Sequence, residues 1–206
     1  MTHYGMAIDL NRCFGCQTCA VACKMANNLP KNVSYNRVLT TTGEQLDSAS
    51  GNFPNCELSF LPVQCQHCED PACMDVCPTG ATSKDEETGI VSVDSEQCIG
   101  CQSCIHACPY EGVRTLITSP EYHLDVEVGE QDAPPHKEST VEKCTFCKNL
   151  IDRGEVPACM QLCPGRARYW GDLDDPNSEV SKAIQGREYQ TLVEASTTKP
   201  SVYYLK

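Results

Sequence analysis

The chain has 206 residues, of which 17 are cysteine and only 6% are aromatic, so apolar burial alone offers a weak basis for a fold. Sixteen basic residues stand against 28 acidic ones, a formal charge of −12, which excludes the basic surface that nucleic acid requires. No segment approaches the ~20 apolar residues of a membrane helix, so we expect no direct membrane span. The first residues, MTHYGMAIDLNRC, contain neither an apolar signal core nor paired arginines.

Sixteen of the cysteines form four groups along the chain. Group one, CFGCQTCAVAC, and group three, CIGCQSCIHACP, have the C-x2-C-x2-C-x3-C spacing of bacterial ferredoxins. Group two, CQHCEDPACMDVCP, and group four, CTFCKNLIDRGEVPACMQLCP, share the first and last gaps but carry an insertion before the third cysteine. The groups are, in order, Cys13, Cys16, Cys19 and Cys23; Cys65, Cys68, Cys73 and Cys77; Cys98, Cys101, Cys104 and Cys108; and Cys144, Cys147, Cys159 and Cys163.

Three chemistries compete for these thiols. Disulfides fit poorly, because 17 is an odd number and no secretory signal is visible. A zinc site typically takes two CxxC pairs, which leaves no role for the third cysteine of each group, although a zinc-stabilised interaction scaffold stays as a rival. The spacing favours four 4Fe-4S clusters, with the sixteen cysteines as iron ligands. Cys56 is left over, and we expect it to be a small buried residue.

Residues beside the ligands add detail. Gly15 and Gly100 precede the second ligand of groups one and three, where a missing Cβ lets backbone N–H groups approach the inorganic sulfurs; an ordinary turn explains them as well. Proline follows the fourth cysteine in the other three groups, but Lys24 stands there in group one, which we interpret as a departure without consequence. We expect His67 to be a hydrogen-bonded structural residue, and Tyr169 and Trp170 to be packing residues.

The segments between the groups suggest few regular elements. Residues 24–64 contain strand-like VSYNRVLTTTG and a polar SASGNFPN turn region, whereas residues 78–97 predict a hairpin with its turn at 87–89 and a strand over 90–94. Residues 24–64 and 109–143 are long connectors, which we expect to cover the rest of the fold or contact a partner.

The segment after group four predicts a turn, a helix and a tail. Asp172, Asp174 and Asp175 suggest a cation site, but a solvated turn is the interpretation that we favour. A helix is expected to start over 178–183, followed by a tail that ends in TTKPSVYYLK.

Crossed ligation sets the predicted architecture, because the fourth cysteine of one group binds the other cluster in two-cluster ferredoxins. Groups two and three enclose a self-contained module, so groups one and four must pair across it. We therefore predict an α+β fold of two bacterial-ferredoxin-like two-cluster modules, an inner one (65–108) inserted in an outer one (1–64 plus 109–206), with long connecting loops and a C-terminal tail. The predicted ligand sets are Cys13, Cys16, Cys19 with Cys163; Cys23 with Cys144, Cys147, Cys159; Cys65, Cys68, Cys73 with Cys108; and Cys77 with Cys98, Cys101, Cys104.

No nucleophile–base pair, phosphate-binding loop or dinucleotide motif is visible, so we expect no catalytic site of its own and electron conduction as the function. The cysteine groups, CQHCEDPAC, GDLDDPNSEVS (Gly171–Ser181) and TKPSVYYL (Thr198–Leu205) resemble the four-cluster electron-transfer (beta or B) subunits of molybdopterin oxidoreductases of the dimethyl sulfoxide reductase superfamily. The ending is more similar to the polysulfide, tetrathionate and arsenate respiratory types than to dimethyl sulfoxide reductase itself, and reductive dehydroxylases of phenols are similar too. Some relatives replace a third-group cysteine; Cys101 is present here, which implies four clusters.

The resemblance implies a large catalytic subunit with molybdenum or tungsten, and electron relay between it and a membrane quinol-linked subunit or another donor, in anaerobic respiration or reductive metabolism. It also implies a membrane-associated complex, either cytoplasmic or exported with a twin-arginine-bearing partner. The alternative is a free polyferredoxin, or the cluster subunit of a hydrogenase or formate dehydrogenase.

Overall fold

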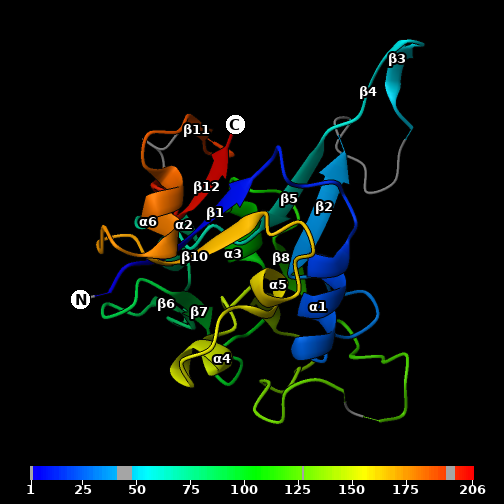
Figure 1. The fold of residues 1–206 in the computed structure, drawn as a ribbon. Coiled ribbons are helices and arrows are strands. Elements are labelled where there is room, and N and C mark those ends of the chain that lie inside the picture. The colour runs from blue at the N-terminus through cyan, green and yellow to red at the C-terminus, as the bar shows by residue number, and fades with distance from the viewer. Residues whose placement is uncertain (1, 41–47, 127, 194–197) are drawn as a thin grey trace.

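Short helices and narrow sheets alternate along the chain (Figure 1), in a computed structural model that describes residues 2–40, 48–126, 128–193 and 198–206. The strands are β1 Tyr4–Asp9, β2 Asn36–Thr40, β3 Ser50–Asn52, β4 Asn55–Glu57, β5 Phe60–Gln64, β6 Thr82–Lys84, β7 Val91–Val93, β8 Arg114–Leu116, β9 Val141–Lys143, β10 Arg168–Asp172, β11 Tyr189–Gln190 and β12 Val202–Leu205. The helices are α1 Thr18–Ala26, α2 Ala72–Asp75, α3 Ser103–His106, α4 Lys148–Asp152, α5 Ala158–Gln161 and α6 Glu179–Ile184. The predicted α+β class is confirmed.

Antiparallel strand pairs link the cysteine groups in sequence order. The pair β2–β5 joins group one to group two, β6–β7 joins two to three, and β8–β9 joins three to four. Strand β10, which follows group four, pairs antiparallel with β1, which precedes group one. The repeat seen in the sequence is therefore a structural repeat, in which a strand leads into each group and another leads out.

A four-stranded sheet with the order β10-β1-β12-β11 holds the two chain ends together. Met6, Ala7 and Ile8 of β1 are at most 1% exposed, because β1 has a neighbour on each side and α6 packs on it and on β10. The segment predicted as a C-terminal tail contributes β12, which runs parallel to β1 inside this sheet. The C-terminus is thus an integral part of the core (Figure 1).

The helices that carry the third ligands meet in two pairs. Helix α1 of group one packs against α5 of group four, and α2 of group two packs against α3 of group three. Each begins at the residue before the third cysteine of its group, so the backbone turns immediately at that ligand. The four groups therefore meet two by two.

The connectors are more regular than expected. The predicted hairpin is confirmed, with its strands at β6 and β7 and its turn between Asp85 and Gly89. Strand β2 confirms residues 36–40 of the strand-like segment 33–43; residues 33–35 are not in a strand, and residues 41–43 lie outside the described residues. The β3–β4 hairpin projects from the body of the molecule (Figure 1).

The turn and the helix after group four are as predicted. Asp172 accepts bonds from the backbone N–H groups of His3 and Asp174, as expected of a turn, and Ser178 caps α6 by accepting from the Ser181 N–H at 3.1 Å. None of the helices in the described part of the chain is long and apolar enough to cross a membrane.

Candidate iron–sulfur cluster sites

One set of neighbouring cysteine thiols is completely buried. Burial raises the pKa of Cys23 well above its usual value, and repulsion from the neighbouring thiols of Cys144, Cys147 and Cys159 raises it further. These four side chains come from groups one and four, and all of them are buried. They make up the set predicted around Cys23.

The other sets of neighbouring thiols also combine cysteines from two groups. Burial raises the pKa of Cys13, and the thiols of Cys19 and Cys163 add to it; burial likewise raises the pKa of Cys108 to about 11, with Cys65 and Cys73 adding to it. A hydrogen bond with Ser103 lowers the pKa of the exposed Cys101 although the thiol of Cys77 opposes this. In each case the fourth cysteine of one group faces thiols of another.

The residue before the second cysteine adopts a left-handed conformation in every group. Its φ is 70° at Gly15, 66° at Gly100, 42° at His67 and 56° at Phe146. A Cβ at Gly15 would lie 2.3 Å from the ring of Phe60, and one at Gly100 would lie 2.4 Å from the backbone oxygen of residue 139. The two glycines therefore serve the turn, as one of the two interpretations held, and close packing also requires them.

His67 and Phe146 fill the corresponding positions of groups two and four and stack on each other. Their ring centroids are 3.7 Å apart and their planes differ by 16°. The Nδ1 of His67 accepts a bond from the Val91 N–H at 3.1 Å, and burial lowers the pKa of this histidine far below its usual value. The structural role predicted for His67 is confirmed, and the stack joins groups two and four.

Trp170 extends this aromatic column. Its ring stacks on Tyr4 at 5.0 Å and meets the edge of Phe146 at 4.8 Å. Tyr169 accepts a bond from Arg12 at 3.0 Å and packs under α6. The packing roles predicted for both residues are confirmed.

Backbone N–H groups point at ligand sulfurs in groups two, three and four. Four donors lie 3.4 Å from the sulfur atoms that they face, namely Thr82 N to Cys77, Val141 N to Cys98, Phe146 N to Cys144 and Ala167 N to Cys163. Such bonds favour thiolates and are one of the factors that set cluster potentials.

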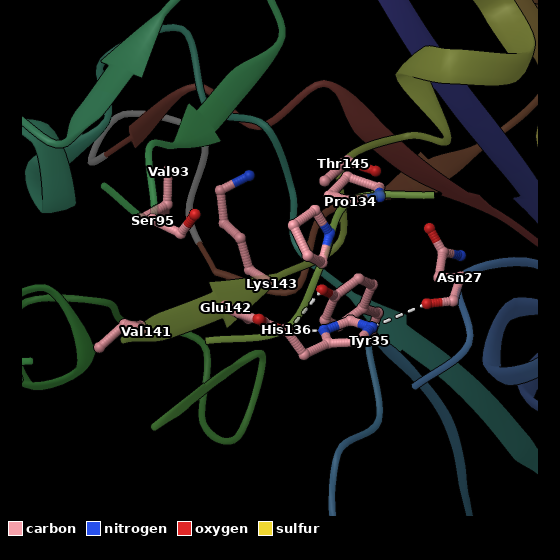
Figure 2. A pocket seen from close by; sticks show the side chains of 11 residues that line it. Asn27, Tyr35, Val93, Ser95, Pro134, His136, Val141, Glu142, Lys143 and Thr145 are labelled. Atoms are coloured by element: carbon pink, nitrogen blue, oxygen red, sulfur yellow. Dashed lines mark hydrogen bonds and ion pairs between the residues drawn. The ribbon is translucent and has the colours of Figure 1, made fainter. Parts of the chain in front are cut away.

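A polar network of side chains lines a small pocket near these thiols (Figure 2). Glu142 accepts a bond from the hydroxyl of Tyr35 at 2.8 Å and lies 2.7 Å from the Nδ1 of His136, whose Nε2 is 2.8 Å from the backbone oxygen of Asn27. The carboxamide of Asn27 in turn lies 3.7 Å from the sulfur of Cys23. The network borders a cavity of about 70 Å³. It holds Asn27 against the thiols, and no spacing in the sequence indicates it.

The sequence interpretations of Lys24 and Cys56 were wrong. Lys24 has a structural role, because its Nζ donates to the backbone oxygens of Pro30, Lys31 and Val33 at 2.7–3.0 Å and so fixes the loop after α1. Cys56 is exposed on β4 rather than buried, because every residue of β3 and β4 is exposed among the residues that the structure describes. A lysine at a helix end could have suggested the first role.

The donor set fits iron–sulfur clusters. Burial and mutual repulsion hold thiols such as Cys23 and Cys159 in the neutral form, which a positive metal core would reverse by deprotonating them. The Nη1 of Arg114 is buried without a hydrogen-bond partner among the described residues, beside the sulfur of Cys73. An orphaned cationic donor next to thiols suits a negatively charged cluster with its own sulfur acceptors.

Comparison with known proteins agrees with this chemistry. The family model of the 4Fe-4S dicluster domain matches residues 56–120 and 132–173. A Halobacterium salinarum protein, named as the iron–sulfur B chain of a dimethyl sulfoxide reductase, is 42% identical over the whole of this chain and 79% of its own length. The B chain of the selenate reductase of Mesobacillus selenatarsenatis is 41% identical over 97% of this chain and 70% of its own. The arsenate respiratory reductase iron–sulfur subunit of a Shewanella species is 34% identical, over 98% and 95%.

The fold and the thiol sites thus define an iron–sulfur protein of the 4Fe-4S dicluster class. The chain belongs to the family of iron–sulfur subunits of dimethyl sulfoxide reductase-family complexes. It is an electron-transfer subunit, and a non-catalytic one, of a molybdopterin oxidoreductase complex.

Proposed function

We propose that this subunit holds four 4Fe-4S clusters, each bound by a crossed set of cysteines, and that they carry single electrons between two partner proteins. Set A is Cys13, Cys16, Cys19 and Cys163; set B is Cys23, Cys144, Cys147 and Cys159; set C is Cys65, Cys68, Cys73 and Cys108; and set D is Cys77, Cys98, Cys101 and Cys104. A 4Fe-4S cluster supplies one-electron chemistry when bound, and the chain supplies ligands, N–H donors and exclusion of water.

The observation that carries the proposal is the meeting of each fourth cysteine with the thiols of a different group. Cys23 faces Cys144, Cys147 and Cys159, whereas Cys163 adds to the repulsion at Cys13. Spacing alone made this pairing an expectation, and the electrostatic neighbours support it independently.

Contacts between the sets support the order A, B, C, D. Repulsion from Cys19 of set A contributes at Cys159 of set B, and repulsion from Cys65 of set C contributes at Cys144 of set B. The stacked rings of His67 and Phe146 link sets B and C. Arg114 lies against thiols of sets C and D. The four ligand sets thus follow one another in a single line, with set A at one end and set D at the other.

The helix and strand contacts favour the two-module arrangement. Packing of α1 on α5 and pairing of β1 with β10 unite sets A and B in an outer module, 1–64 plus 109–206. Packing of α2 on α3, with the β6–β7 hairpin, unites sets C and D in an inner module, 65–108. The inner module is thereby inserted in the outer one.

We place the two partner proteins at the two ends of this line of ligand sets, next to sets A and D. Cys16 and Cys101, in sets A and D, are exposed, and the apolar side chains of Phe14 and Ile99 beside them are 57% and 63% exposed. Exposed apolar residues around a redox centre suit a protein interface. One partner is a large molybdopterin catalytic subunit; the other is a membrane quinol-linked subunit or another electron donor. The complex is membrane-associated, either cytoplasmic or exported with a twin-arginine-bearing partner.

Anaerobic purification from the native host, with metal analysis, tests this proposal. About 16 iron atoms per chain are expected, together with molybdenum or tungsten on a large co-purifying subunit. Iron without a second metal or partner would instead favour a free polyferredoxin or the cluster subunit of a hydrogenase or formate dehydrogenase. Zinc in place of iron would contradict the cluster assignment.

A further inference from the structure

Two buried arginines occupy equivalent places in the two halves of the molecule. Arg114 opens β8, a few residues after the fourth cysteine of group three, and Arg168 opens β10, a few residues after the fourth cysteine of group four. They are 4% and 3% exposed, although arginine is rarely buried without a partner of opposite charge.

Arg168 lies between thiols of sets A and B. Its Nη1 is 3.7 Å from the sulfur of Cys159, and the same guanidinium hydrogen-bonds Cys19. Its other hydrogen-bond partners are neutral: Gln64 Oε1 at 3.2 Å and Met6 Sδ at 3.3 Å from Nη1, and Asn36 Oδ1 at 3.1 Å from Nη2. The polar contacts orient the guanidinium but do not balance its charge.

Arg114 has the same relation to sets C and D. Its Nη2 is 2.7 Å from the sulfur of Cys73, and the guanidinium also hydrogen-bonds Cys104. Its Nη1 is buried without a hydrogen-bond partner within the described ranges. Both arginines therefore contact the third cysteine of two different groups, and these two cysteines belong to neighbouring sets.

Charge balance explains why the chain keeps two cations there. Within the part of the chain that the structure describes, neither guanidinium forms an ion pair with an aspartate or glutamate. An isolated cation in a protein interior is strongly unfavourable unless negative charge lies next to it. The available negative charge is that of the cysteine ligands, each shared with iron.

We propose that Arg114 and Arg168 are bridging residues, each of which donates N–H···S bonds to the third cysteines of two neighbouring ligand sets and raises the reduction potential of both clusters in that pair. Reduction adds negative charge to a cluster, so a fixed cation between two clusters favours the reduced form of each. The inference rests on the proposed ligand sets, and it assigns one arginine to sets A and B and the other to sets C and D.

Redox titration followed by electron paramagnetic resonance, on the full complex prepared anaerobically, tests the assignment. In Arg114→Met, the reduction equilibrium of two clusters is expected to shift at least tenfold toward the oxidised form, which lowers their reduction potentials by about 59 mV for a one-electron couple. The potentials of the other two clusters are expected to stay unchanged. Arg168→Met is expected to lower the complementary two. Arg153→Met is the matched control, because Arg153 is exposed and paired with Glu130, Asp132 and Glu155.

Two further variants keep the test decisive if a methionine variant loses iron. Arg114→Gln and Arg168→Gln retain an amide donor but remove the charge, so a fall in the same two potentials is expected. Full iron content with unchanged potentials, or equal shifts in all four clusters, would overturn the bridging role. A wild-type complex with far fewer than about 16 iron atoms per chain would instead refute the ligand sets.

Discussion

Groups one and three differ from groups two and four in what surrounds the same CxxC turn. In groups one and three, here called the end groups, the left-handed residue is glycine and the second cysteine is exposed, with Phe14 or Ile99 open to solvent beside it. In groups two and four, the central groups, that residue is His67 or Phe146, whose rings are buried and stacked.

The difference shows how one repeated motif serves two purposes. Glycine lets neighbouring chain approach the end groups and leaves no side chain over their exposed edge. A ring at the same place costs backbone strain but fills the space between two modules. The end groups thus leave apolar and ligand side chains open to solvent, where we propose that partners dock, whereas the central groups contact each other.

Removal of one cysteine ligand is expected to give the largest difference between the central groups and the end groups. Cys159→Ser, in set B, is expected to remove most of the iron from the whole chain, because set B is fully buried and cluster binding is coupled to folding. Cys101→Ser, at the exposed end, is expected to remove no more than about 4 of 16 iron atoms. Iron per purified chain measures both; equal losses would contradict the comparison.

Loss of the central ring is the next largest effect. Phe146 is 1% exposed, so Phe146→Ala is expected to destabilise the protein by about 3–5 kcal/mol and to lower the temperature at which the cluster absorbance bleaches. Phe14→Ala is the control in an end group; Phe14 is 57% exposed, and a change within about 0.5 kcal/mol is expected. A comparable drop in both variants would show that the stack has no special weight.

Alanine in place of the end-group glycine tests the close approach. Gly100→Ala is expected to cost clearly more stability than the ~1–2 kcal/mol of an unfavourable left-handed residue, because the new Cβ would meet a backbone oxygen at 2.4 Å. Gly80→Ala supplies the matched control, with a φ of 72° and no atom within 4 Å of the added Cβ. Thermal bleaching midpoints of the two variants should therefore differ, and equal midpoints would refute the packing argument.

The smallest effect concerns pH at the network beside set B. Burial opposes protonation of His136, but the hydrogen bond and the charge attraction to Glu142, together with bonds to the backbone of Asn27 and Asn28, outweigh burial and raise the pKa of the histidine. The resulting stabilisation is complete below the unfolded-state pKa of about 6.5 and is lost as pH rises through the higher folded-state value. The bleaching midpoint of the wild type should fall over that range more than that of His136→Gln. If the bleaching midpoints of the two proteins changed with pH in parallel, His136 would have no part in this pH dependence.

Sequence reasoning reached the local features and the pairing of group one with group four and of group two with group three, with which the helix packing agrees, but it missed the other contacts between distant segments. Cysteine spacing predicted the four groups, and alternation with a turn signal predicted the β6–β7 hairpin, because both depend on neighbours in the chain. The contact of His67 with Phe146 joins residues far apart in sequence, so no local pattern could reveal it.

Other misses have the same cause. Arg168 opens an ordinary strand pattern, and only the fold brings it to Cys19 and Cys159. Cys56 was expected inside because cysteine is commonly buried, but it lies on a projecting hairpin. The C-terminal segment has strand propensity in Val202–Leu205, yet its place beside β1 follows from a parallel pairing that spans the whole chain.

Iron and acid-labile sulfide, counted per chain in the anaerobically purified complex, test the central claim of four 4Fe-4S clusters most directly. The account predicts about 16 of each, with an iron loss confined to one set when Cys101 is changed to serine. About 8 of each, or zinc bound in place of iron, would contradict it.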